Sequence, residues 1–133
     1  MRLYLNLCVP VGGPGGMRAA LEALVALDRV YLRSHPMTPD IYRAGIVYLR
    51  DVDEGDQGRP LSELWYTIPD VIASGGADCK CLAAWRVAAL RELGEHADPW
   101  VLQVGPATWH VVVRRADGTM EDPSALLGMR GKG

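Results

Sequence analysis

The stretch Gly75–Leu90 constrains the fold more than any other part of this 133-residue chain. Two glycines precede Asp78, a residue type that caps helix N-termini, and small and apolar side chains then recur at helical spacing. Gly94 follows at a position where helices commonly end. The pattern predicts a helix from about Cys79 to Leu93 that buries one broad apolar arc. That arc consists of Cys79, Leu82, Ala83, Val87, Ala89, Leu90 and Leu93.

A second helix is predicted from Met17 to about Arg33, because apolar residues again share one face. The members of this stripe are Met17, Ala20, Leu21, Leu24, Leu27, Tyr31 and Leu32. Asp28 falls inside the stripe, and Arg86 is similarly placed among apolar residues of the later helix. An ion pair between Asp28 and Arg86 would satisfy both charges, so we expect this pair to join two packed helices.

Several shorter segments have the composition of strands, and Pro69 is suited to begin a short helix. The predicted strands are Arg2–Val9, Ile46–Leu49, Trp100–Val104, Trp109–Arg115 and Thr119–Glu121. Tight Gly-containing turns separate the last three strands, which predicts an antiparallel meander after the helices. The expected fold class is α+β, with the Cys79 helix packed on a small antiparallel sheet.

Length, charge and cysteine content narrow the class of protein. We expect a single domain over residues 1–129 and a flexible tail at 130–133. The formal net charge is −2 and no apolar run approaches the ~20 residues of a membrane helix, so neither nucleic acid nor a membrane is an expected partner. Three cysteines without a recognisable secretion signal predict free thiols in a cytosol-like compartment.

Cys79 is the first candidate for chemistry, because it lies at the start of the predicted helix. Unpaired N–H groups there favour a thiolate and are candidate donors to an oxyanion. Cys81 lies about 200° further around the helix, so the two cysteines are poorly placed to serve one centre. A zinc site made by Cys8, Cys79, Cys81 and His110 is an alternative that this geometry disfavours.

A nucleophilic cysteine needs a base, and the base needs an orienting acceptor. His110 lies in a strand rich in Val and Trp, where a histidine is either a satisfied half-buried residue or a functional one. Asp122 follows a Gly turn and precedes Pro123, which is also the composition of an ordinary turn. The residues alone leave both interpretations open.

The order of these three candidates resembles the transglutaminase-like branch of the papain-type cysteine hydrolases. In that family Gly-Asp-Cys opens a helix, a strand carries His-x-x-Val, and Asp-Pro-Ser/Thr follows a turn. The corresponding sequences are Ala77-Asp78-Cys79, Trp109-His110-Val111-Val112-Val113 and Glu121-Asp122-Pro123-Ser124. The resemblance covers roughly Trp65 to Met129. Ala77 in place of the common Gly, and Cys81 in place of a frequent acidic residue, depart from the pattern.

The resemblance implies a papain/transglutaminase-like core and a catalytic triad. Cys79 would be the nucleophile, His110 the general base and acid, and Asp122 the residue that orients His110. The implied function is a cysteine-dependent amide hydrolase or acyltransferase that works through a thioester, with a peptidase as first choice. Its substrate would be a peptide or protein amide, and it would need no cofactor or metal.

The ending Leu127-Gly128-Met129 is similar to that of small transglutaminase-like proteins of tailed phages. This similarity adds an alternative of another class: a structural or assembly component of a phage particle that keeps the fold, active or not. Its partners would be phage tail or head proteins. The expected location is the cytoplasm of a bacterial host, or the virion.

Overall fold

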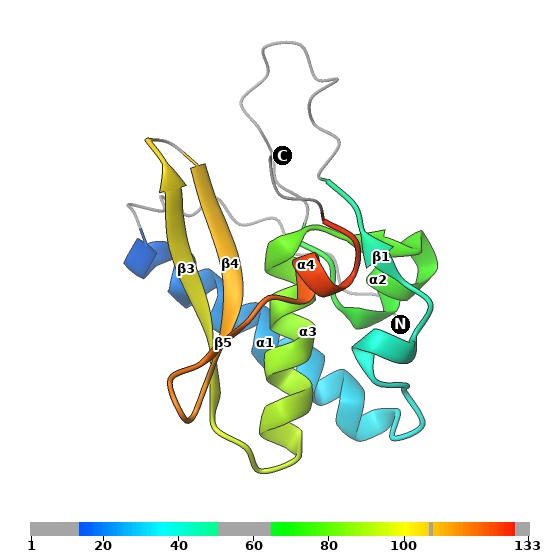
Figure 1. Cartoon of the computed structure of the whole chain (residues 1–133). Helices are drawn as coiled ribbons and strands as arrows, with labels where there is room; N and C mark the ends of the chain where they lie inside the picture. Colours follow the sequence, from blue (N-terminus) through cyan, green and yellow to red (C-terminus); the bar gives the residue numbers. More distant parts are fainter. Residues whose placement is uncertain (1–13, 51–64, 107, 130–133) are drawn as a thin grey trace.

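A computed structural model describes residues 14–50, 65–106 and 108–129 and has helices and small sheets in a mixed α+β arrangement (Figure 1). The α+β class predicted from the sequence is confirmed. The elements, in chain order, are α1 (Pro14–Ser34), the 3-10 helix η1 (Ile41–Arg43), β1 (Val47–Tyr48), α2 (Ile68–Ser74), β2 (Gly76–Ala77), α3 (Cys79–Glu92), β3 (Ala97–Gly105), β4 (Thr108–Arg115), β5 (Met120–Glu121) and α4 (Pro123–Leu126).

The strands form two separate sheets. β3, β4 and β5 are antiparallel neighbours in that order, which confirms the predicted meander. β1 pairs with β2 in parallel, in the register Val47↔Gly76 and Tyr48↔Ala77. The sequence predicted β1 but not β2. This short pair brings β1 beside the residues that lead into α3.

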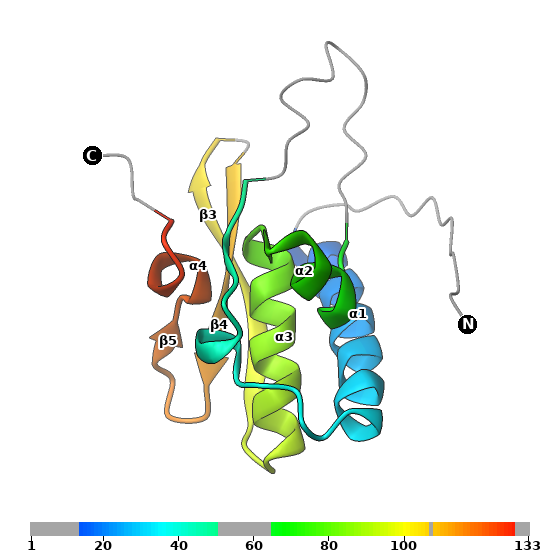
Figure 2. The same cartoon turned by 90° about the vertical axis from the view of Figure 1, so that its right-hand side faces the viewer.

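Helix α3 lies at the centre of the molecule, with α1 along one side and the β3–β4 hairpin along another (Figures 1 and 2). The sequence predicted that only one arc of this helix is buried, but α3 is buried on more than one side. Cys81, Ala84, Trp85 and Ala88 are buried as well, because α1 and α2 also pack against α3. The prediction is wrong for Leu93, which is 80% exposed because the helix has already ended there.

Helix α1 begins three positions before the predicted start, at Pro14, a residue type that suits the first turn of a helix. Its buried stripe runs through Leu21, Leu24, Val25 and Asp28. The predicted stripe is wrong for Leu27, which is 46% exposed. Val25 takes its place because positions 21, 25 and 28 lie on one face at helical spacing.

The predicted Asp28–Arg86 ion pair is wrong. Asp28 is fully buried, and its Oδ1 accepts the backbone N–H of Ile68 at 2.9 Å, at the start of α2. Burial raises the pKa of Asp28 to about 8, so the carboxyl is neutral at pH 7 and needs no cation. Arg86, on α3, instead binds Glu121 of β5 and Asp40, the residue that caps η1.

Gly75 and Gly76 serve two different geometric needs. Gly75 ends α2 in the left-handed region at φ 80°, as C-terminal glycines commonly do. Gly76 has ordinary dihedrals, but a Cβ there would lie 2.0 Å from the carbonyl oxygen of Val47. The pair β1–β2 therefore requires a residue without a side chain at position 76.

The predicted strand Arg2–Val9, Cys8 within it and the tail at 130–133 lie outside the described residues. The predicted elements that lie within them are present, with small shifts at their ends.

Candidate active site

Cys79 is the first residue of α3, and Asp78 caps the helix as predicted. The Oδ1 atom of Asp78 accepts the N–H of Cys81 at 3.4 Å, which satisfies one of the donors that a helix start leaves unpaired. The side chain of Cys79 is partly buried against the core. The nucleophile candidate is thus held in a fixed position on the first helical turn.

The prediction that the start of the helix favours a thiolate at Cys79 is wrong for the pKa that this thiol has in the fold. Burial raises the pKa of Cys79 to about 11, and the nearby carboxylates of Asp78 and Asp122 act in the same direction. The backbone N–H of Val111 and the ammonium of Lys80 oppose this shift without overcoming it. At neutral pH the thiol is protonated, so any reaction at its sulfur requires a base that removes the proton.

His110 and Asp122 are the predicted base and its acceptor, and they are in contact. The Nε2 atom of His110, on β4, lies 2.8 Å from Oδ2 of Asp122. Asp122 is also the N-cap of α4, where its Oδ1 accepts the N–H of Ala125 at 3.2 Å. Because a carboxylate only accepts, Nε2 carries the hydrogen of the neutral ring, and Nδ1 keeps a lone pair for an incoming proton.

Asp122 and the backbone of the residue that follows His110 both approach Cys79 on the first turn of α3. The backbone N–H next to Cys79 belongs to Val111, which directly follows His110, and the Asp122 carboxylate acts on the same sulfur. Helix α4, which Asp122 caps, lies beside the upper part of α3 and close to β4 (Figure 1). Asp122 therefore connects His110, which it contacts, with the surroundings of the Cys79 sulfur.

Cys81 belongs to a different environment. It is buried, and its sulfur accepts the backbone N–H of Tyr66 at 3.2 Å, whereas Cys79 lies against Val111. Among residues 14–50, 65–106 and 108–129, no group of three or more His, Cys, Asp or Glu side chains is arranged to hold a metal ion. The fourth member of the alternative zinc site, Cys8, lies outside these ranges.

Lys80 is a residue of the site that the sequence did not single out. It is only 4% exposed, forms an ion pair with Asp78 and lies 5.5 Å from the ring centroid of Trp65. A buried cation next to the nucleophile favours the thiolate once the proton has left. The available signal was the sequence Asp-Cys-Lys, which places opposite charges on both sides of the cysteine.

Tyr48 is a second residue that the sequence did not indicate. Burial and, secondly, the charge of the Cys79 thiolate raise the pKa of its phenol, which places the hydroxyl in the electrostatic range of the sulfur. The phenol stays protonated and can donate a hydrogen bond. Its position follows from the β1–β2 pairing, which sets Tyr48 beside Ala77.

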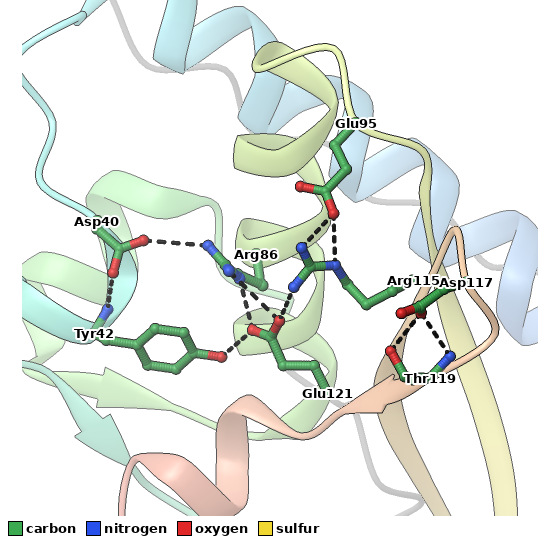
Figure 3. Close-up of polar contacts among 8 residues, drawn as sticks. All are labelled: Asp40, Tyr42, Arg86, Glu95, Arg115, Asp117, Thr119 and Glu121. Atoms are coloured by element: carbon green, nitrogen blue, oxygen red, sulfur yellow. Dashed lines mark hydrogen bonds and ion pairs between the residues drawn. The ribbon is translucent and has the colours of Figure 1, made fainter.

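Glu121, the residue before Asp122, is anchored by three donors (Figure 3). Its carboxylate binds Arg86 Nε at 2.6 Å, Arg115 Nη1 at 2.6 Å and the hydroxyl of Tyr42. Burial acts to raise the pKa of Glu121, but hydrogen bonds from Arg86 and Tyr42 hold it below its usual value. The donors come from α3, β4 and η1, so they fix the backbone from which Asp122 projects.

No helix among the described residues is long and apolar enough to cross a membrane. No protein-family model matches the chain, and the comparisons with curated proteins and with solved structures found no match either. The function therefore has to be argued from the site itself.

Proposed function

We propose that this chain is a cysteine-dependent amide hydrolase or acyltransferase with a papain/transglutaminase-like triad of Cys79, His110 and Asp122. The observation that carries the proposal is the 2.8 Å contact between His110 Nε2 and Asp122 Oδ2. His110 lies on β4, and the backbone N–H of the following residue, Val111, approaches the Cys79 sulfur. A peptidase is the first choice of activity, with a peptide or protein amide as substrate.

The first half-reaction would form a thioester. Nδ1 of His110 takes the proton of the Cys79 thiol as the sulfur attacks the carbonyl carbon of the amide. The C–N bond then breaks, and the leaving amine receives this proton from the His110 ring. Asp122 accepts from Nε2 throughout, so it holds the ring and stabilises the positive charge that appears on it.

The second half-reaction would release the acyl group. Water, in a hydrolase, or a primary amine, in an acyltransferase, attacks the thioester carbon while His110 again removes a proton. The C–S bond breaks, and the proton returns to the Cys79 sulfur. The atoms supplied by the protein are the same in both outcomes, and only the attacking molecule differs.

The developing oxyanion needs donors close to the sulfur. The backbone N–H of Cys79 lies at the first helical position, where no acceptor within the helix is available. The phenol of Tyr48 supplies a second donor from β1. We assign these two groups to the oxyanion on the basis of their positions beside the nucleophile.

Iodoacetamide labelling, followed residue by residue by mass spectrometry, tests the proposal without knowledge of the substrate. Between pH 6 and 9 we expect Cys79 to react at least ten-fold faster than Cys8 or Cys81. His110→Ala should abolish this advantage, because burial already raises the pKa of this thiol to about 11 and no base would then remove its proton. Slow labelling of all three cysteines at similar rates would contradict an activated nucleophile.

An activity measurement then separates hydrolysis from transfer. The protein is incubated with a peptide mixture and a fluorescent primary amine, and products are identified by mass. Cleaved peptides indicate a hydrolase, and amine-labelled peptides indicate an acyltransferase. Cys79→Ala should remove either product while the circular dichroism spectrum stays unchanged. A product that persists in Cys79→Ala would refute the assignment of the nucleophile.

A further inference from the structure

Two arginines lie over Trp100, a residue of the same hairpin as His110. The guanidinium carbon of Arg18, on α1, is 4.8 Å from the ring centroid of Trp100, and that of Arg114, on β4, is 4.6 Å from it. Stacking covers the flat face of a guanidinium and leaves its N–H edges free for an anion. We call these three residues the Arg–Trp–Arg stack.

The two arginines differ from most others that the structure describes. Five of the others form ion pairs with carboxylates: Arg29, Arg33, Arg86, Arg91 and Arg115. Within residues 14–50, 65–106 and 108–129, neither Arg18 nor Arg114 forms an ion pair; the charge of Arg18 acts on Glu22, whose own hydrogen bonds go to Arg91. Asp98 stands opposite Arg114 in the register, but its Oδ1 binds Arg91 at 3.1 Å.

Arg18 also contains a buried donor without an acceptor. Its Nε atom is inaccessible to solvent and has no hydrogen-bond partner among the described residues. A buried donor on a permanently charged group is costly to leave unpaired. The Nη groups of Arg18 are not among the buried unpaired atoms, and a ligand carboxylate is their natural complement, because its two oxygens can accept two parallel N–H bonds.

The register places the Arg–Trp–Arg stack close to the proposed site. Trp100 is opposite Val112, and Leu102 is opposite His110, so Trp100 and His110 lie on one face of the hairpin. Two residues separate these positions along a strand, which corresponds to roughly 7 Å. An extended peptide whose amide reacts next to His110 would reach Trp100 within two or three residues.

We propose that the Arg–Trp–Arg stack is a substrate subsite that binds a carboxylate near the reacting amide. The preferred substrate is then an acidic peptide segment, or a peptide whose terminal carboxylate lies close to the amide. The inference rests on the proposed function for the position of the reacting amide, but the binding of a carboxylate to the stack does not require any chemistry at Cys79.

Binding is measured with the whole chain carrying Cys79→Ala, so that no turnover occurs. The probes are an N-acetylated, C-amidated Gln-Glu-Glu-Gln peptide, its all-Gln counterpart, and the all-Gln peptide with a free carboxyl end. Calorimetry gives the affinities, and the indole N–H resonances in an NMR titration show whether Trp100 responds. We expect the Glu peptide or the free-ended peptide to bind at least ten-fold more tightly than the neutral one, and the difference identifies the carboxylate source.

Arg114→Gln and Arg18→Gln should each reduce this preference at least ten-fold. Arg114 is exposed, so its replacement is not expected to disturb folding. Arg18→Lys serves as a second variant, because it retains the charge but not the paired N–H edges. Arg43→Gln is the matched control, since Arg43 is also an exposed arginine but lies on η1, and it should bind like the parent chain.

Equal binding of acidic and neutral peptides, or a preference that survives both Arg→Gln changes, would overturn the subsite. Failure of the proposed function has a different signature. In that case His110→Ala leaves the labelling of Cys79 by iodoacetamide unchanged, whatever the peptide affinities are. The two experiments therefore fail independently.

Discussion

Glu121 and Asp122 are neighbours in the chain, yet their carboxylates belong to two separate networks. Glu121 binds Arg86 and Arg115, which come from α3 and β4. Asp122 binds the Nε2 atom of His110 and caps α4. The first carboxylate immobilises the end of β5, and the second uses that fixed position to hold a histidine.

Replacement of Asp122 can separate its two roles. Asp122→Asn keeps an N-cap of similar quality but loses the charge that orients His110, so stability should change little while activity falls roughly 10²–10⁴-fold. Asp122→Ala loses both, and should in addition reduce the free energy of unfolding by about 1 kcal/mol. Urea denaturation and iodoacetamide labelling of Cys79 measure the two effects. Full reactivity in Asp122→Asn would show that the contact with His110 has no catalytic role.

Glu121→Gln tests whether the network in Figure 3 supports the site. The change leaves two partly buried guanidinium groups without their shared charge and should lower the free energy of unfolding by about 1–3 kcal/mol. Glu95→Gln is the matched control, because Glu95 also binds Arg115 but is more exposed, and it should cost less than about 1 kcal/mol. Labelling of Cys79 should slow only in Glu121→Gln. Equal effects of both variants would argue against a positioning role.

The raised pKa of Asp28 should make the stability of the fold depend on pH. Its pKa is raised by burial from 3.8 to about 8 in the folded chain, so the folded state binds more protons than the unfolded state between these values. The free energy of unfolding should therefore fall as pH rises, by up to about 1.4 kcal/mol per pH unit from this group.

Asp28→Asn removes this dependence, because the amide oxygen can still accept the Ile68 N–H and never ionises. The variant should gain stability relative to the parent chain as pH increases from 5 to 8. Urea denaturation at each pH provides the measurement. Parallel stability curves for the two proteins would show that Asp28 does not titrate in this range.

Gly76→Ala tests the close approach of β1 and β2. The new Cβ would overlap the Val47 carbonyl, so the strands must separate, at a cost of about 3 kcal/mol. Gly75→Ala is the control: its Cβ meets open space, and the left-handed backbone alone should cost about 1–2 kcal/mol. Thermal unfolding ranks the two. A smaller loss in Gly76→Ala than in Gly75→Ala would contradict the packing described for this strand pair.

The sequence predicted the elements that depend on local pattern. Helix α3, its Asp78 cap and the three-strand meander follow from spacing and turn residues over short distances. The family resemblance implied that Asp122 orients His110, and the two side chains are in contact, whereas the catalytic role of the three residues stays a prediction.

The errors concern relationships that only the tertiary fold creates. The partner of Asp28 is a backbone N–H, which carries no signal in the residue type at position 68. Arg86 meets Glu121 because η1 and β5 converge on α3, and no local pattern encodes that approach. The neutral Cys79 thiol likewise results from burial by other elements, which outweighs the local effect of a helix end.

The buried carboxyl of Asp28 also limits how Cys79 can be activated. If alkalinity alone were to ionise the sulfur, the pH would have to approach 11, but Asp28 loses its proton near pH 8. That earlier ionisation would put a charge in the core at the start of α2, the helix that leads into Gly75, β2 and the nucleophile. Because Asp28 ionises at a lower pH than Cys79, raising the pH would destabilise the start of α2 before it deprotonated the Cys79 thiol. Under the proposed function, proton removal by His110 would avoid this charge in the core.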